Sequence, residues 1–323
     1  MTSLRFAVIG AGRLGASFFR ALTARGALPT GLLVRSPAGR ERARAWTGME
    51  PAADLEELVA DQPDLYIISV PDEAVPRVAR ELADHLGRIL RSRAVSGRTP
   101  VVLHTSGVTS VSALSPCARL GCTVLVFHPL QTFPDPLSGA ERFQGAAVAI
   151  TPPAGRERSL ALTFGHGLAD FLGARTFVLE DDRRTLYHAA AVLASNYFVA
   201  LEEEARRLFV QAGLPAHEAL SLFLPLVSAT LDGIASKGTA LALTGPISRG
   251  DVAAVERHLE ALRAEAPDVL PLYVALGLAT VGLAHDRQSL DETQTDLLRR
   301  TLIAYYPPAP MISADRSTRT GAP

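Results

Sequence analysis

The chain has 323 residues, of which 48% are hydrophobic and 20% are charged, and its formal net charge is −1. This length is typical of about two domains, and this composition is that of an ordinary globular protein rather than a disordered one. The near-zero net charge argues against functions that need a strongly charged surface, such as general binding to nucleic acid or to an anionic membrane.

Few features point to an oxidising compartment, a metal or a membrane. The two cysteines, Cys117 and Cys122, are too few for a disulfide framework or a metal site, and we expect two structural thiols and no metal. The chain enters a strand almost at once, and its longest uncharged apolar run, over 269–284, is shorter than the roughly twenty residues that span a bilayer. We therefore expect a cytoplasmic protein without a membrane segment.

Short apolar strands alternate with amphipathic helices in the first half. Strands are expected in RFAVIGA, GLLVRS, PDLYIISVP, TPVVLHTSG, CTVLVFHPL, AAVAITP and ARTFVLE. Helices are expected from about Leu14 to just before Gly26, in PAGRERARAW, in DLEELVADQ, and over 72–86 with Asp72 as N-cap. Because strands separated by helices form right-handed βαβ units, this pattern predicts an α/β domain with a doubly wound parallel sheet.

From about residue 181 the pattern changes to long apolar helices only, which predicts an all-α domain. The expected helices cover 183–212, 215–235, 251–265, 268–285 and 291–303. Helices this apolar need partners, and we expect a homodimer built through this half. The predicted domains are therefore 1–180, an α/β domain; 181–305, a helical domain for substrate binding and dimerisation; and 306–323, a proline-rich, disordered tail.

A glycine motif joins the first strand to the first helix. Gly10, Gly12 and Gly15 in VIGAGRLG match the spacing G-x-G-x-x-G. The first glycine permits a tight turn, the second lets the backbone approach a pyrophosphate, and the third allows close packing of helix on strand. Arg13 and Leu14 open the helix, whose N-terminal amides are donors for a phosphate. The motif predicts a Rossmann domain that binds a dinucleotide.

A basic residue follows the second strand, where proteins that bind NAD carry an acidic one. Arg35 is suited to hold a 2′-phosphate through bidentate hydrogen bonds, Ser36 can add another, and Arg40 can close over it from the next helix. These residues favour NADP(H) over NAD.

Polar and apolar residues at three further strand ends predict the edge where the reaction takes place. In an open parallel sheet, ligands bind beyond the carboxyl ends of the strands. Val70 and Pro71 are expected to form an apolar floor beside the cofactor, and Thr105 and Ser106 to place hydroxyls near the reacting carbon. His128 is a titratable group at the end of another strand.

Seven segments together carry a family resemblance. They are VIGAGRLG, VRS, SVPD, LHTSG, FHPLQTF, YHAAAVLASNYFVAL and LTGPISRGD. Over nearly the whole chain except the tail, they resemble the Rossmann-like and DUF2520 domain-containing oxidoreductases. The layout is more distantly similar to pyrroline-5-carboxylate reductase and to ketopantoate reductase. The resemblance implies an NADPH-dependent reductase whose helical domain is like the C-terminal domain of 6-phosphogluconate dehydrogenase.

The resemblance also points to individual residues. They are His128, His188, Ser195, Asn196, Gly245, Pro246, Arg249 and Asp251. Ketopantoate reductases of similar layout use a lysine on the first long helix as proton donor, but Lys237, the one lysine in this chain, lies later. The lysine mechanism is therefore not expected to transfer directly.

The residues themselves suggest a different proton donor. Reduction of a carbonyl needs a hydride at carbon and a proton for the oxygen, and His188 is the best placed titratable side chain on the helical half. In one continuous helix, positions 188 and 195 share a face, so Ser195 would look into the same cleft, with Asn196 beside it as an oxyanion donor. The alternative is that His188 packs in a structural seam.

Two residues of the segment LTGPISRGD have distinct expected roles. Arg249 is a candidate to clamp a substrate carboxylate, and Asp251 is expected to N-cap the helix that follows. His258 and Glu202, Glu203 and Glu204 are expected to be structural or solvent-facing.

Three functions stay open at this point. The first is an NADPH-dependent reductase of a small 2-oxo acid, with ketopantoate as the leading guess. The second is reduction of a C=N bond, as in a pyrroline carboxylate. The third is a non-catalytic NADP-binding sensor or partner protein.

Overall fold

The structure is a computed structural model that describes residues 3–92 and 99–306. The predicted tail over 306–323 lies, apart from Tyr306, outside the described residues. The chain forms two compact units, residues 1–198 and 199–323, which are described separately below. The boundary therefore lies 18 residues beyond the predicted one at 180/181, because the first helix after the last strand belongs to the N-terminal unit.

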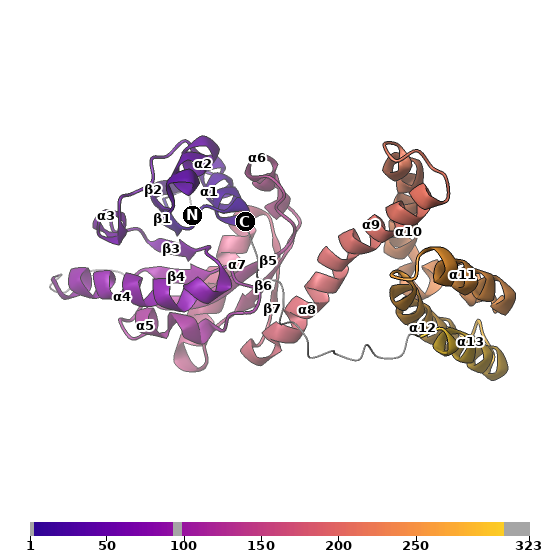
Figure 1. The fold of residues 1–323 in the computed structure, drawn as a ribbon. Coiled ribbons are helices and arrows are strands. Elements are labelled where there is room, and N and C mark those ends of the chain that lie inside the picture. The colour runs from indigo at the N-terminus through magenta and orange to yellow at the C-terminus, as the bar shows by residue number, and fades with distance from the viewer. Residues whose placement is uncertain (1–2, 93–98, 307–323) are drawn as a thin grey trace, which may run out of the picture. The chain divides into compact units, whose positions relative to one another are not determined.

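The N-terminal unit alternates strands and helices as the sequence predicts (Figure 1). The strands are β1 (Arg5–Ile9), β2 (Leu28–Leu33), β3 (Leu65–Ile68), β4 (Val101–His104), β5 (Thr123–Leu130), β6 (Ala147–Thr151) and β7 (Arg175–Val178). The α-helices are α1 (Arg13–Ala24), α2 (Pro37–Thr47), α3 (Leu55–Ala60), α4 (Val75–Ser92), α5 (Ser115–Ala118), α6 (Pro136–Gly139), α7 (Arg158–Leu172) and α8 (Arg184–Ala194).

The strands form one seven-stranded sheet in the order β2-β1-β3-β4-β5-β6-β7. Every pair is parallel except β5 and β6, so the expectation of a wholly parallel sheet is wrong at this one place. The connection between these two strands holds only the short helices α6 and η3 (Glu141–Phe143), whereas a parallel crossover usually carries a full α-helix. The strand order reverses between β1 and β3, which is where open α/β sheets bind ligands.

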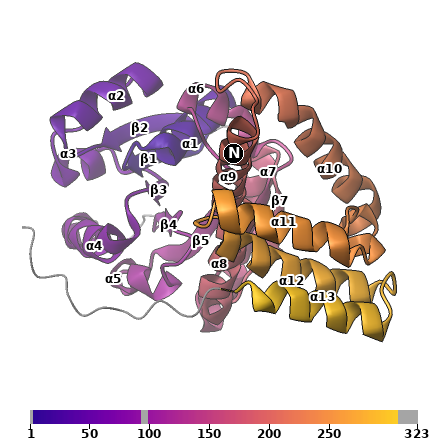
Figure 2. The same ribbon diagram turned by 45° about the vertical axis from the view of Figure 1, so that its right-hand side comes forward.

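Helices cover both faces of this sheet (Figures 1 and 2). On one face, α1 and α7 pack through Phe18, Leu22 and Leu168 on alternate residues of the central strands. On the other face, α4 and α5 pack through side chains such as Leu82 and Cys117. The inner strands β1 and β3 are buried on both faces, which explains their nearly continuous apolar sequences.

Local signals in the sequence set several element ends. Gly26 has φ +90° just after α1, as its predicted position beyond the helix end requires. The prediction of Asp72 as an N-cap is wrong, because Asp72 lies inside the 3₁₀ turn η1 (Asp72–Ala74), and α4 begins only at Val75.

The C-terminal unit is all-helical, as predicted. It contains most of α9 (Asn196–Gln211), then α10 (Ala219–Ala242), η6 (Ile247–Arg249), α11 (Val252–Glu265), α12 (Leu270–Asp286) and α13 (Glu292–Ala304). Helices α12 and α13 lie side by side (Figure 2) around a core that includes Leu259, Val274 and Leu298. The expected single helix over 183–212 is instead two helices, because the backbone of Ser195 leaves the helical region at φ −127° and ψ −67°.

Helix α10 is unusual for its exposed apolar residues. It is long and apolar enough to cross a membrane by length and composition alone, a test that core helices of soluble proteins also pass. Its exposed side chains include Leu226 (64% exposed) and Leu241 (70% exposed). Within this chain, α10 therefore leaves much of its apolar surface uncovered.

Candidate functional site

The glycine motif forms a tight turn at the carboxyl end of β1. Gly10 has φ +96°, and a Cβ there would collide with the carbonyl of Ser69 at the end of β3. A Cβ at Gly15 would collide with the carbonyl of Gly10, so this glycine lets α1 pack against the turn. At Gly12, by contrast, no atom lies within 4 Å of a Cβ position, and no side chain caps α1. The first-turn amides of α1 thus face an open space next to the strand-order reversal.

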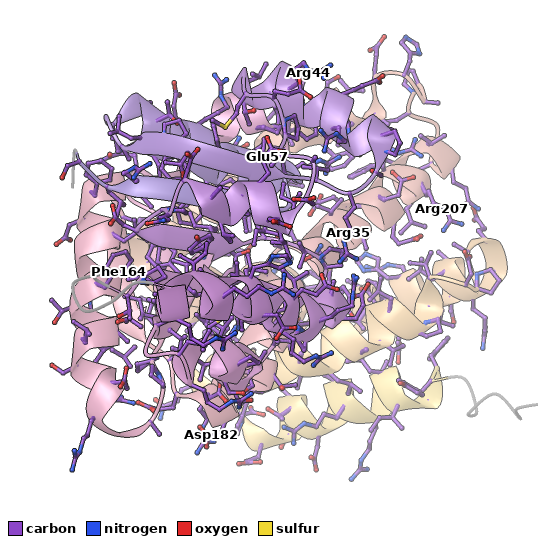
Figure 3. All side chains as sticks on the ribbon, turned by 90° about the vertical axis from the view of Figure 1, so that its left-hand side faces the viewer. Arg35, Arg44, Glu57, Phe164, Asp182 and Arg207 are labelled. Carbon is purple, nitrogen blue, oxygen red and sulfur yellow. The ribbon has the colours of Figure 1, made fainter. Side chains whose placement is uncertain are left out.

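Three polar residues after β2 are predicted to hold the 2′-phosphate, and their side chains differ in the hydrogen bonds that they already make within the protein. Arg35 is at the surface (Figure 3), 56% exposed, and pairs with the half-exposed carboxylate of Glu81 at 2.9 Å. The hydroxyl of Ser36 caps α2 by accepting a hydrogen bond from the amide of Gly39. Arg40 donates to the carbonyls of Pro51 and Ala52, both at 2.6 Å. Arg40 therefore braces its own loop, and its expected closure over a phosphate stays a prediction.

The ends of β3 and β4 are tied to one another. Val70 contacts the turn at Gly10, where its side chain would lie 2.8 Å from a Cβ, and Pro71 is exposed beside it. The hydroxyl of Thr105 donates to that of Ser69 at 3.2 Å. The hydroxyl of Ser106 donates to Thr109 at 2.8 Å and accepts from two loop amides, and both Thr105 and Ser106 are buried. These two hydroxyls hold the loop together, and their expected place near a reacting carbon stays a prediction.

A cluster of aromatic polar side chains lies where β4 and β5 end. His128, on β5, shares a hydrogen bond between its Nδ1 and the hydroxyl of Tyr187 on α8, at 2.9 Å. The ring of His188, the next residue of α8, lies 6.1 Å from that of His128. Gly107 fits between them: a Cβ there would collide with Nδ1 of His188 and lie 3.1 Å from Nε2 of His128. The structure thus brings together two predicted residues, His128 and His188.

A buried cation fixes α8 against the loop after β4. Arg184, which is 1% exposed, donates to the carbonyl of Thr109 at 2.8 Å, to the hydroxyl of Thr151 at 2.9 Å, and to the carbonyl of Ser106. Just before α8, the carboxylate of Asp181 accepts hydrogen bonds from the hydroxyl of Ser110 at 2.5 Å and from the amide of Val111. These bonds fix the loop that carries Gly107 relative to the helix that carries Tyr187 and His188.

Burial keeps two histidines of this region neutral. Burial, followed by the charge of Arg184, lowers the pKa of His104 to about 4, and the same two causes, together with His188, lower the pKa of His128 to about 4. The Nδ1 of His104 accepts from the amide of Ser106, and its Nε2 lies 3.3 Å from the carbonyl of Ser110, so His104 carries its proton on Nε2. Burial also raises the pKa of Tyr187 to about 12, although Arg184 opposes this.

One nitrogen of the cluster has no partner. Nδ1 of His188 is buried and makes no hydrogen bond to any described residue. Such an atom is uncommon, because leaving a buried polar group unpaired costs about 1–3 kcal/mol. His188 is therefore held by packing against Gly107 rather than by a polar partner.

The other predicted residues lie at the end of α8 or in the C-terminal unit. Ser195 and Asn196 lie at the break between α8 and α9, so the argument that a continuous helix puts Ser195 on the face of His188 does not hold. Arg249 is exposed in the C-terminal unit. Its neighbours Gly245 (φ +93°) and Gly250 (φ +71°) shape the turn, and Asp251 caps α11 by accepting from the amide of Ala254, as predicted.

Sequence reasoning missed Arg184, Tyr187 and His104. Tyr187 stands next to His188 and His104 precedes Thr105, so both adjoin residues that were chosen. The sequence of an amphipathic helix does not predict which strand end a tyrosine or an arginine on it will contact. Arg184 also does not stand out, because the chain contains many arginines. Among the described residues, no group of three or more His, Cys, Asp or Glu side chains is arranged to hold a metal ion.

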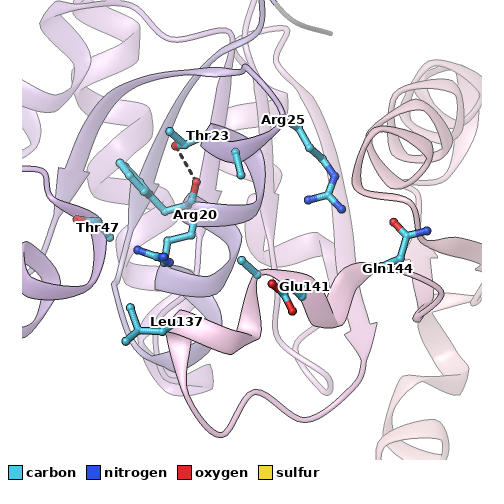
Figure 4. A pocket seen from close by; sticks show the side chains of 10 residues that line it. Arg20, Thr23, Arg25, Thr47, Leu137, Glu141 and Gln144 are labelled. Atoms are coloured by element: carbon cyan, nitrogen blue, oxygen red, sulfur yellow. Dashed lines mark hydrogen bonds between the residues drawn. The ribbon is translucent and has the colours of Figure 1, made fainter.

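A hollow of about 600 Å³ lies along the later turns of α1 (Figure 4). It is lined by Arg20 and Arg25 from α1 and by Leu137 and Glu141 from the segment after β5. The guanidinium of Arg25 is bound to the carbonyls of Ala21 and Leu172. This hollow is at the opposite end of α1 from the glycine turn and separate from the histidine cluster.

Comparisons with known proteins agree with this architecture. A Rossmann-like domain matches residues 1–129, and a domain of unknown function, DUF2520, matches residues 154–280. The chain joins a Rossmann-like domain to a DUF2520 domain. This confirms the resemblance found in the sequence. No curated protein matches the sequence.

Solved structures share the fold over almost their whole length. A "putative NADP oxidoreductase" from Bacteroides fragilis is 22% identical, with a TM-score of 0.66, covering 88% of this chain and 99% of that one. The 1-pyrroline-5-carboxylate reductase of Streptococcus pyogenes is 16% identical, with a TM-score of 0.58 and coverage of 90% and 100%. A reductive aminase from Aspergillus terreus, solved with NADPH and ethyl-5-oxohexanoate, is 18% identical, with a TM-score of 0.57 and coverage of 91% and 98%.

Proposed function

We propose that this protein is an NADP(H)-dependent reductase that transfers a hydride to a small 2-oxo acid. The observation that carries the proposal is the juxtaposition of a glycine turn with uncapped helix amides and a polar cluster at the ends of neighbouring strands. Solved structures of the same fold include an NADP oxidoreductase by name and an enzyme bound to NADPH, which supports the choice of cofactor.

The residues at the glycine turn fit a dinucleotide. The open space at Gly12 leaves room for a pyrophosphate, and the first-turn amides of α1 can donate to it. Arg35 and Arg13 are exposed, and the pair of Arg35 with Glu81 is a surface pair of the kind that contributes little. A 2′-phosphate can therefore take the place of Glu81 beside Arg35, with the backbone of Ser36 next to it.

Bound NADPH would supply the hydride, and the protein must hold the substrate and provide a proton. His128 and His188 are the candidates for this proton, because they lie together beside Gly107 at the carboxyl ends of β4 and β5. Val70 and Pro71, at the end of β3, are the candidates for the apolar wall beside the nicotinamide. Arg249 keeps its proposed role as a clamp for the substrate carboxylate, and Ser195 and Asn196 stay candidates for contacts to the substrate.

The charge environment favours a carbonyl as the group that is reduced. Burial first and Arg184 second lower the pKa of His128 to about 4. Burial disfavours charge of either sign, but the positive charge of Arg184 disfavours only added positive charge. A carbonyl develops negative charge on oxygen during hydride transfer, whereas an imine is reduced as a cation. A small 2-oxo acid such as ketopantoate is therefore the first candidate.

Reduction of a C=N bond is the second candidate, because named proteins of this fold are pyrroline-5-carboxylate reductases and a reductive aminase. A substrate panel separates the two. NADPH consumption is followed with ketopantoate and other small 2-oxo acids, and in parallel with pyrroline-5-carboxylate and other cyclic imines. Turnover only with imines would replace the first candidate by the second.

A panel without any turnover, from a protein that binds NADPH, would favour the third possibility, a sensor or partner protein. In that case Gly12→Val should abolish function in the cell, while His128→Ala and His188→Ala should leave it intact. If the protein is a reductase, all three substitutions should abolish function.

A second copy of this chain is the proposed partner. In the C-terminal unit, exposed apolar side chains are concentrated on α9 and α10. They are Val199, Leu201, Leu220, Leu222, Leu224, Leu226, Leu231, Ile234 and Leu241. Large exposed apolar surfaces on soluble proteins mark sites of interaction. A homodimer that buries this surface explains a helix that is apolar and yet mostly uncovered.

A further inference from the structure

The cluster at Gly107 contains a group that the sequence analysis did not assign, the hydroxyl of Tyr187. It lies 2.9 Å from Nδ1 of His128, and the two rings pack edge to face at 5.5 Å. The ring of Tyr187 also packs edge to face on Phe177 of β7. The tyrosine is therefore held on two sides, and its hydroxyl is fixed on one nitrogen of the histidine.

The direction of this hydrogen bond follows from the two groups. A phenol O–H is the stronger donor of the pair, and an imidazole nitrogen without hydrogen is the stronger acceptor. When Tyr187 donates to Nδ1, the one proton of neutral His128 stays on Nε2. That nitrogen is the one that approaches Gly107, since it lies 3.1 Å from a Cβ position there. His128 thus presents an N–H at the end of β4.

On this basis, which rests on the proposed function, we propose that Tyr187 is the proton source for reduction and that His128 passes the proton on. As a hydride reaches the substrate carbon, the substrate oxygen takes the Nε2 proton of His128 while the Tyr187 hydroxyl gives its proton to Nδ1. One N–H bond and one O–H bond break, and one O–H bond and one N–H bond form. The substrate alkoxide becomes an alcohol and Tyr187 becomes a tyrosinate. After the product leaves, the tyrosinate takes the Nδ1 proton back while a solvent water gives a proton to Nε2, which restores the starting tautomer of His128.

The charged surroundings suit this role. The charged and titratable groups that act on His128 are Arg184, His188 and Asp72, and the one that acts on Tyr187 is Arg184. Burial raises the pKa of Tyr187 to about 12, and the guanidinium of Arg184 offsets part of this rise by stabilising a tyrosinate, whereas the same guanidinium repels an imidazolium. Neutral His128 can therefore relay a proton without ever becoming a cation, which its lowered pKa of about 4 makes difficult.

The test begins with the apo protein and does not depend on a substrate. Nuclear magnetic resonance of protein labelled with ¹⁵N in histidine reports which ring nitrogen carries hydrogen, and His128→Asn identifies the signals of His128. We expect hydrogen on Nε2 at neutral pH and a changed Nδ1 signal in Tyr187→Phe, which keeps both ring contacts. If Nδ1 of His128 carries the hydrogen, His128 donates to the Tyr187 hydroxyl instead of accepting from it, and this result would overturn the relay.

The second part measures rates with the substrate that the panel identifies. Tyr187→Phe should bind NADPH within about twofold of the unchanged protein and lose about 10²-fold in the rate of hydride transfer. The matched control is Tyr273→Phe, because Tyr273 makes the same kind of hydrogen bond to Nδ1 of His258, at 2.8 Å, in the C-terminal unit. Equal rates for the two variants would overturn the inference.

A third variant covers the case in which Tyr187→Phe folds poorly. 3-Fluorotyrosine at position 187 keeps the hydroxyl but lowers its pKa, so the alkaline limb of the pH–rate profile should move to lower pH. A purely structural role would leave that limb in place. Failure of wild-type protein to bind NADPH would contradict the proposed function instead, and the tautomer of His128 would still be measurable.

Discussion

At the scale of single residues, burial is the main cause that keeps two histidines, His104 and His128, neutral. His104 and His128 both have a pKa of about 4, lowered mainly by burial and next by Arg184. A neutral imidazole can donate and accept at once, as His104 does between Ser106 and Ser110. This region therefore uses histidines as hydrogen-bonding groups rather than as cations.

The same shifts predict a loss of stability in mild acid. Between about pH 6.5 and pH 4 the unfolded chain takes up protons on these histidines and the folded chain does not, so the free energy of unfolding falls as the pH falls. Urea midpoints measured from pH 7.5 down to pH 4 test this, and His104→Asn and His128→Asn should each flatten the dependence. Equal midpoints at pH 7 and pH 5 would contradict it.

Arg35 provides the residue-scale test of cofactor choice. If its guanidinium meets a 2′-phosphate, Arg35→Ala should weaken NADPH binding by about 10- to 100-fold and leave NADH binding nearly unchanged. Arg77→Ala is the matched control, because Arg77 also pairs with Glu81, at 3.5 Å, and is likewise exposed. If both variants lose the same NADPH affinity, Arg35 acts through its pair with Glu81 or through the overall positive charge of the surface, and not through a direct contact with the 2′-phosphate.

At this scale, sequence reasoning succeeded where the backbone itself sets the requirement. Gly10 and Gly15 were predicted correctly because there is no room for a Cβ at either position, and Asp251 because it caps its own helix. Both requirements are set by residues close in sequence or by the backbone of a tight turn. Sequence reasoning says less where side chains have several possible partners. Arg40, Thr105 and Ser106 are bound to neighbouring backbone or hydroxyl groups, and spacing along the chain does not reveal such competition.

At the scale of elements, α8 carries Tyr187 and His188, and Arg184 and Asp181 position this helix against the loop after β4. The sequence predicts a helix here, but not its end at Ser195, because no proline or glycine marks the break. The strand ends that bear His104, Gly107 and His128 were predictable from the βαβ pattern. The helix that meets them was not, because only tertiary packing decides it.

The close fit between α8 and this loop predicts a strict need for glycine at 107. Gly107→Ala should lower the free energy of unfolding by about 1–3 kcal/mol, because the new methyl group collides with His188. Gly282→Ala is the control, since no atom lies within 4 Å of a Cβ there and the residue is within α12. It should be neutral or stabilising by up to about 1 kcal/mol. Equal urea midpoints for the two variants would contradict the described packing.

At the scale of the whole molecule, the exposed apolar residues of α9 and α10 predict self-association. Wild-type protein should sediment as a dimer in analytical ultracentrifugation, and Leu226→Glu combined with Leu241→Glu should shift it toward the monomer. Leu160→Glu, at a 58% exposed position on α7, should leave the dimer intact. A monomeric wild-type protein, or one that pellets with phospholipid vesicles through α10, would contradict a homodimer as the partner.

The most direct measurement is a calorimetric titration of the purified protein with NADPH and, separately, with NADH. The glycine turn at the strand-order reversal and the exposed guanidinium of Arg35 predict that NADPH binds and that NADH binds more weakly by about tenfold or more. Binding of neither nucleotide would contradict the proposed reductase. Tighter binding of NADH would contradict the role given to Arg35.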